Sequence, residues 1–175
     1  SEKEKMGAIL FFGKGECVNC HTGPALNSTQ FYALGMQDFS GEHISQTIAQ
    51  DFITTAEGRG GFTGNPEDFY KFKVPQLYNL TDSPFLGHGG SFTSVKEVIA
   101  YKNEGISENP LVPSQRISQE FSPLGLTELE IEQLTSFVES ALHDPNLLRY
   151  APETLPSGNC FPNNDDQSRQ DIGCQ

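Results

Sequence analysis

The sequence has few basic residues, no tryptophan and no long apolar run. Its 11 lysines and arginines face 23 acidic residues, giving a formal net charge of −12, whereas a nucleic-acid-binding protein needs a basic face. No apolar stretch approaches the roughly 18 residues that a membrane-spanning helix requires. No long amphipathic repeat is present, which excludes coiled coils and solenoids. No secretory signal opens the chain, so we expect any export signal to have been removed.

Length and composition are those of one small, loop-rich domain. The chain has 175 residues, of which 17 are glycine and 11 are proline, and 35% are hydrophobic. A chain of this length forms one domain, or two at most, and this hydrophobic content can bury a modest core.

Four cysteines fall into two pairs. Cys17, Cys20 and His21 form Cys-x-x-Cys-His, the attachment signature of c-type haem. The two thiols add across the porphyrin vinyl groups, and the histidine supplies a nitrogen ligand to the iron. A redox Cys-x-x-Cys would open a helix after a strand, and a zinc site would need a second close ligand pair. The sequence therefore predicts one covalent haem c.

Cys160 and Cys174 lie in an irregular acidic tail. We expect a disulfide between them, with two free thiols as the alternative. The Asn and Asp residues at 163–166 offer oxygen ligands for calcium, but they lack the alternating spacing of a calcium loop, so a solvated turn is preferred. Covalent haem and a disulfide together indicate a periplasmic or secreted bacterial protein.

The periodicity predicts three helices. The first covers residues 1–12, and two capping boxes open helices over 94–103 and 127–143. A short helix is expected near 42–50, and the glycines and proline of 57–66 predict a loop.

These helices have definable faces. In the first, Met6, Ile9 and Leu10 share one side. In the last, Glu128, Glu130 and Glu132 lie in the first turns, where the helix dipole favours them, and we interpret them as a solvated helix start rather than a docking face. The fold class expected is all-α, a c-type cytochrome fold whose long irregular loops wrap one haem. Residues 1–150 would form this domain, and 151–175 a disulfide-closed tail.

The middle of the chain resembles the di-haem cytochrome c peroxidase and MauG family. Residues 72–81 (FKVPQLYNLT) and 83–92 (SPFLGHGGSF) carry the resemblance, and the haem motif and the helix over 95–103 follow the same order. The match covers about residues 5–142 and resembles the C-terminal haem domain, the half that receives electrons.

The sequence departs from this family in three ways. It has one haem motif where members have two, and it lacks the N-terminal domain that carries the peroxide-reducing haem. Tyr78 replaces an arginine, and His88-Gly89-Gly90 replaces His-Asp-Gly, with Gly87 inserted before it. These changes affect the peroxidase reaction and leave the haem-holding scaffold intact.

Further candidate site residues come from the resemblance and from residue chemistry. His88 matches a histidine near the haem edge, for which hydrogen bonding is preferred over ligation. Arg59 is a candidate partner of a haem propionate, with a solvated loop arginine as the alternative. The remaining histidines, His43 and His143, lie in polar contexts and are expected to be exposed.

The sixth iron ligand has several candidates. The family places this ligand on the helix after the His-x-Gly-Ser turn, which gives Lys102, or Tyr101 if the register slips by one. Met36 on a loop and an open or water-bound position are the alternatives. A lysine ligates iron only as the neutral amine, which burial and the metal both favour.

The preferred function is therefore one-electron transfer by a mono-haem c-type cytochrome domain, serving a redox partner protein. The alternative is a peroxidase- or oxidase-like haem enzyme domain, which would need a distal acid or base. The chain would then act alone, beside a second domain, or as a homodimer.

Overall fold

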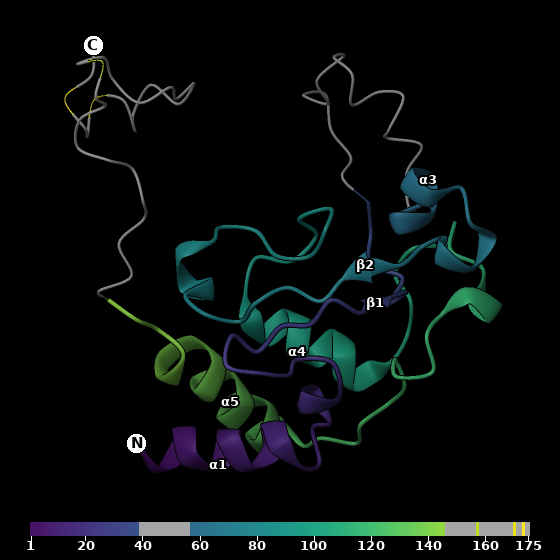
Figure 1. Cartoon of the computed structure of the whole chain (residues 1–175). Coiled ribbons are helices and arrows are strands. Elements are labelled where there is room, and N and C mark those ends of the chain that lie inside the picture. The colour runs from purple at the N-terminus through teal and green to yellow at the C-terminus, as the bar shows by residue number, and fades with distance from the viewer. Residues whose placement is uncertain (39–56, 146–156, 158–169, 171–172, 174–175) are drawn as a thin grey trace. The chain divides into compact units, whose positions relative to one another are not determined.

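In the computed structural model, the described residues are 1–38 and 57–145, together with residues 157, 170 and 173. The chain divides into two compact units, Ser1–Asp144 and Pro145–Gln175. The first unit contains all the named helices and strands (Figure 1).

The first and last helices of this unit pack directly on each other. Helix α1 (Glu2–Phe12) begins with a capping box, in which the Ser1 side chain accepts from the backbone of Glu4. Helix α5 (Glu128–Ser136) lies against it, and Gly7 allows the two backbones to meet closely. A Cβ atom on Gly7 would overlap the carbonyl oxygen of Gln133 and lie 2.7 Å from Cβ of Phe137.

The buried face of α1 differs from the predicted one. Gly7, Leu10 and Phe11 are buried, whereas Ile9 is 64% exposed and Met6 is 37% exposed. The glycine sets this face, because only a residue without a side chain fits where α1 crosses α5. Only Leu10 of the predicted apolar face therefore belongs to the core.

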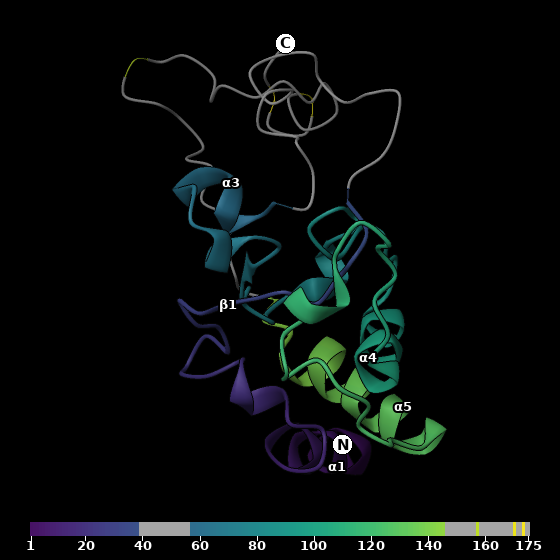
Figure 2. The same cartoon turned by 90° about the vertical axis from the view of Figure 1, so that its right-hand side faces the viewer.

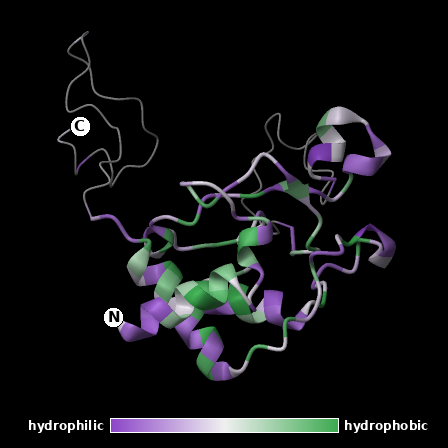
Figure 3. Ribbon diagram, turned by 60° about the horizontal axis from the view of Figure 1, so that its bottom comes forward, coloured by the Kyte–Doolittle hydropathy of each residue, from purple (hydrophilic) through white to green (hydrophobic). Residues whose placement is uncertain are grey.

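A third helix, α4 (Val95–Glu104), completes the helical layer. Ser94 and Glu97 form the predicted capping box, and Gly105 ends the helix in the left-handed conformation. Figure 2 shows α4 and α5 together on one side of the unit, above α1. The main core lies among these helices, and the helical part of the molecule carries much of the hydrophobic colour in Figure 3. Its fully or nearly buried members include Phe11, Val95, Ile131, Leu134 and Val138.

The end of the last helix has an unusual geometry. After Ser136 the chain continues as a π-helical turn, Phe137–Ala141, close to the limit of 143 that the sequence predicts. Phe137 and Val138 are buried in this turn, and the Phe137 ring contacts that of Phe11 at 5.4 Å.

The glutamates at the start of α5 are surface residues that also form ion pairs: Glu128 is 67% and Glu132 44% exposed, which agrees with the predicted solvated helix start. Each of these glutamates has a lysine partner from a neighbouring segment: Lys96–Glu128, Lys14–Glu130 at 2.6 Å, and Lys3–Glu132 at 3.2 Å. These pairs connect α5 to α4 and to α1 and its following turn, contacts that no local pattern in the sequence could reveal.

A small sheet corrects the all-α expectation. Strands β1 (Phe31–Tyr32) and β2 (Phe72–Lys73) pair antiparallel, with Phe31 opposite Lys73 and Tyr32 opposite Phe72. Two-residue strands are too short to show any alternation in the sequence. The expectation of a helical fold therefore holds for the core layer and fails for this sheet.

The glycine-rich stretch predicted as loop contains a short helix, α3 (Arg59–Thr63). Gly64 ends it with a φ of 66°, and Asn65 caps the following 3₁₀ turn, Pro66–Asp68. The glycines on either side of α3, Gly58 and Gly64, favour a loop by composition. Gly60, however, is buried against Phe69, and this contact stabilises the short helix. Two further 3₁₀ turns cover Leu80–Asp82 and Ser114–Arg116. The helix expected near 42–50 lies outside the described residues.

Candidate haem site

The two cysteines of the haem motif lie on a single tight turn. Cys17–Asn19 form a 3₁₀ turn shortly after α1, and Cys20 follows it. The thiol of Cys20 lies close to the hydroxyl of Tyr32 on β1. Both thiols are free, and burial raises the pKa of Cys17 to about 11. The turn therefore carries two free thiols, the pair of groups that attachment to two vinyl groups requires.

His21 is oriented by two backbone carbonyls. Its Nδ1 lies 2.9 Å from the Leu26 oxygen and 3.1 Å from the Pro75 oxygen. Carbonyl oxygens only accept hydrogen bonds, so Nδ1 carries the proton and Nε2 carries the lone pair. Burial lowers the pKa of His21, which keeps the ring neutral. A neutral imidazole held through its other nitrogen is the form that ligates a metal, so these residues fit a haem c.

Lys102 of α4 lies near enough to the same two cysteines to interact with them electrostatically. Its half-buried ammonium donates to the Glu120 carbonyl and lies 5.5 Å from the centre of the Phe121 ring. Burial lowers the pKa of Lys102, and the nearby thiols Cys20 and Cys17 act against that change. The fold thus brings this predicted ligand to the haem-attachment turn, although it lies 82 residues after Cys20 in the sequence.

Tyr101 and Met36 take different positions. The Tyr101 hydroxyl donates to the Leu34 carbonyl at 2.6 Å, and burial raises the pKa of Tyr101 to about 12. Met36 packs against a second apolar cluster formed by Phe92, Tyr101 and Phe121, which we call the aromatic cluster. Both side chains are therefore engaged with the protein, and their ligand roles remain alternative predictions.

His88 belongs to a chain of hydrogen-bonded polar side chains. Its Nε2 lies 3.0 Å from Asp38 Oδ1, and its ring stacks on Phe72 at 3.7 Å. Asp38 Oδ2 in turn accepts from Asn109, which is 1% exposed. His88 thus makes a hydrogen bond to protein, and its role at a haem edge stays a prediction. Asp38 and Asn109 belong to no recognisable motif, and only the fold brings them to His88.

The other predicted site residues make contacts of their own or lie outside the described part of the chain. Arg59 pairs with Asp68 at 3.1 Å and lies 4.4 Å from the centre of the Phe31 ring, so its propionate role remains a prediction. His143 faces Asp82 at 3.8 Å and is 37% exposed. His43, Cys160, Cys174 and the candidate calcium ligands at 163–166 lie outside the described residues.

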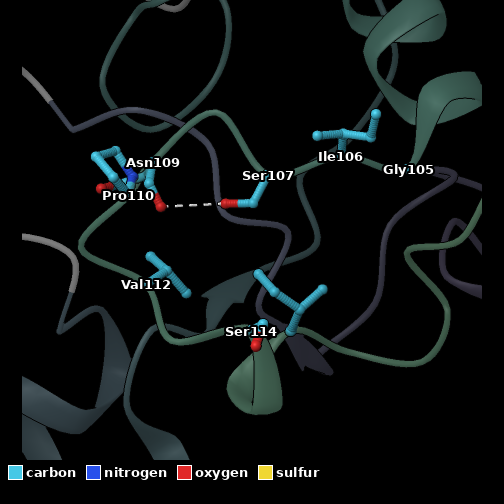
Figure 4. A pocket seen from close by; sticks show the side chains of 8 residues that line it. Gly105, Ile106, Ser107, Asn109, Pro110, Val112 and Ser114 are labelled. Atoms are coloured by element: carbon cyan, nitrogen blue, oxygen red, sulfur yellow. Dashed lines mark hydrogen bonds between the residues drawn. The ribbon is translucent and has the colours of Figure 1, made fainter.

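A surface pocket of about 480 Å³ lies in the segment after α4. Ile106, Val112 and Ile117 provide its apolar lining, and Ser107 donates to the Asn109 carbonyl within it (Figure 4). None of the haem-motif residues lines it. Over residues 1–38 and 57–145, no helix is long and apolar enough to cross a membrane, and no group of three or more His, Cys, Asp or Glu side chains is placed to hold a metal ion.

Known proteins match most of this chain. It is 31% identical over 169 residues to cytochrome-c peroxidase IdrP1 of Pseudomonas sp. (strain SCT), covering 87% of this chain and 43% of that protein. It is 30% identical over 156 residues to IdrP1 of Denitromonas iodatirespirans, covering 80% and 40%. The crystal structure of a MauG-like protein associated with microbial copper homeostasis matches with a TM-score of 0.64 and 27% identity, over 82% of this chain and 47% of that one.

No protein-family model matches the chain. The chain spans about two fifths of the length of the curated relatives it matches. The described unit thus has the fold of one part of these larger proteins.

Proposed function

This chain belongs to the di-haem cytochrome c peroxidase and MauG family, and we propose that it is a haem c domain that carries electrons for a peroxidase-type reaction. The relatives are named peroxidases and are longer than this chain. They favour the peroxidase-like alternative over the stand-alone electron carrier that the sequence led us to prefer. A second domain in the same protein is part of this proposal.

Cys17 and Cys20 would hold the haem, and His21 would ligate its iron through Nε2. The bound haem supplies one-electron chemistry, and the protein tunes it through ligand type and burial. The observation that carries the proposal is the half-buried Lys102, which interacts electrostatically with both cysteines. A neutral amine at the sixth position leaves no place for peroxide, so this domain would conduct electrons rather than reduce peroxide itself.

We propose a periplasmic or secreted location in a bacterium, which covalent haem attachment supports. The partner would be a redox protein, and the net charge of −12 would favour a basic face on it.

The test is the optical and electron-paramagnetic spectrum of the haem-loaded chain. The unaltered protein should be six-coordinate and low-spin and should react slowly with peroxide. Lys102→Ala should open the site to water and give a high-spin spectrum with faster peroxide reaction, whereas Lys102→Met should restore low spin. Lys96→Ala is the matched control, because Lys96 is an exposed lysine on the same helix that pairs with Glu128.

Two outcomes would contradict this assignment. A spectrum that Lys102→Ala leaves unchanged would exclude Lys102 as the ligand and make Met36→Ala the next variant. A high-spin spectrum of the unaltered protein would mean an open site, and peroxide chemistry at this haem itself would then be the function.

A further inference from the structure

A fully buried asparagine holds the segment that carries Met36. The backbone N–H of Asn109 donates to the Gly35 carbonyl at 3.0 Å, and its side-chain amide donates to the Met36 carbonyl at 3.3 Å and to Asp38 at 2.8 Å. Its side-chain oxygen accepts from the backbone of Leu111 at 3.0 Å. Every polar group of this side chain is thus engaged, and only 1% of the residue is exposed.

Other residues from the end of α4 and the following turn hold the rest of the same segment. The contacts are Tyr101 hydroxyl to Leu34 carbonyl at 2.6 Å, Ser107 hydroxyl to Gly35 carbonyl at 3.1 Å, and Gln37 N–H to Glu108 carboxylate at 2.7 Å. Each of residues 34–38 is therefore tied to the chain between 101 and 109. A loop with this many hydrogen bonds has one position, because a buried group that loses its bond is left without a partner.

The held segment places Met36 against the same aromatic cluster that Lys102 borders. Met36 packs against the aromatic cluster, and the Lys102 ammonium lies over the ring of Phe121, a member of that cluster. Two side chains able to ligate iron thus border one group of rings. Thioether sulfur is a common iron ligand in c-type cytochromes. The chemistry of the side chain alone therefore does not decide whether Met36 or Lys102 ligates the iron.

We propose that Asn109 is a positioning residue that selects the iron ligand: by fixing residues 34–38 it holds Met36 in the aromatic cluster and leaves the sixth position to Lys102. The inference rests on the proposed function, since it presupposes a haem held by Cys17, Cys20 and His21. On this proposal, hydrogen bonds made by Asn109, away from the iron, decide which side chain ligates it. The fold would then contain a second possible ligand, Met36, which these hydrogen bonds keep from the iron.

Three haem-loaded variants test this proposal through the ligand-specific near-infrared and nuclear magnetic resonance signals of iron-bound methionine. Lys102→Ala alone should be high-spin, because Met36 is still held. Adding Asn109→Ala should raise the methionine-ligated fraction by at least about ten-fold, the effect of losing one ordinary buried hydrogen bond. Adding Met36→Leu to that double variant should remove the methionine signal.

Either of two results would overturn the proposal: a methionine signal in Lys102→Ala alone, or a folded double variant that stays high-spin. If the double variant fails to fold, Ser107→Ala replaces Asn109→Ala and should give a smaller rise. Thr135→Val is the matched control, because it removes a hydroxyl bond to the Ile131 carbonyl within α5. If Ser107→Ala raises the methionine-ligated fraction no more than Thr135→Val does, the proposal is overturned.

Failure of the proposed function gives a different pattern. If Lys102→Ala keeps the original low-spin spectrum, Lys102 is not the ligand and the selection proposed here falls with it. If Lys102→Ala is high-spin and adding Asn109→Ala produces no methionine signal, Lys102 remains the ligand and only the role proposed for Asn109 is wrong.

Discussion

Two adjacent residues of α4, Tyr101 and Lys102, make different contacts. Tyr101 is buried and donates to a backbone carbonyl, whereas Lys102 is half-buried and interacts electrostatically with the haem-motif cysteines. A register slip of one therefore separates a side chain that fastens a loop from one that lies near the haem-motif cysteines. The family resemblance alone leaves both open, and the contacts of each side chain favour Lys102 as the ligand to test first.

Acid should release the proposed lysine ligand. Burial lowers the pKa of Lys102, so its amine stays neutral to a lower pH than that of a free lysine, and iron binding would extend this range. As pH falls, protons compete for the lone pair, and a protonated amine cannot bind iron. We expect the low-spin absorbance spectrum to convert to high spin while the far-ultraviolet circular dichroism is unchanged.

Lys102→Met provides the control for this acid transition, because a thioether does not titrate. That variant should remain low-spin through the pH range in which the unaltered protein converts. Conversion of both proteins at the same pH would assign the change to unfolding.

At the scale of single residues, the sequence can offer a site where the signal is local. The Cys17–His21 motif is five residues long and can be read without any tertiary structure, whereas the partners of its histidine cannot. The carbonyl of Pro75 that orients His21 is 54 residues away, and Asp38 is 50 residues from His88. Backbone carbonyls carry no residue identity at all, so no motif search can find such partners.

At the scale of elements, the capping boxes predicted the starts of α4 and α5 correctly. Both boxes are present, because a serine or threonine followed by a glutamate three residues later satisfies backbone donors locally. The short helix α3 and the two-residue strands were missed, since their stability comes from tertiary contacts such as Gly60 against Phe69. The exposed side of α1 was missed for the same reason.

Gly7→Ala should destabilise the packing of α1 on α5. Alanine favours a helix over glycine by about 1 kcal/mol, but its Cβ would overlap the Gln133 carbonyl, and that backbone cannot move without shifting α5. We expect a net loss of about 1–3 kcal/mol in the free energy of unfolding, measured by denaturant titration.

Lys5→Ala is the control on the same helix, since Lys5 is 76% exposed and makes only a surface pair with Glu2. It should change stability by less than about 0.5 kcal/mol. A Gly7→Ala variant as stable as this control would show that the two helices separate at little cost.

At the scale of the whole molecule, the two cysteine pairs should have separable roles. Replacing Cys17 and Cys20 with alanine should abolish haem retention after acid–organic extraction and should unfold the domain, because the haem would supply much of its core. Replacing Cys160 and Cys174 should leave haem attached. Thiol titration of the denatured, unreduced chain should find no free thiol if the second pair forms the predicted disulfide.

The opposite results are equally clear. Haem that extracts freely from the unaltered chain would exclude covalent attachment. Two titratable thiols in the haem-loaded chain would exclude the disulfide while leaving the haem prediction intact.

The paired carbonyls at His21 have an electrochemical consequence. A histidine that shares its Nδ1 proton with two acceptors is a stronger electron donor through Nε2, and a stronger donor stabilises ferric over ferrous iron. One acceptor, Leu26, follows the haem motif closely, but the other, Pro75, lies two residues after β2. Any partner that displaced the β2 segment would weaken one of these bonds and raise the reduction potential. Binding of a partner at the small sheet would thereby change the driving force for electron transfer to or from the haem.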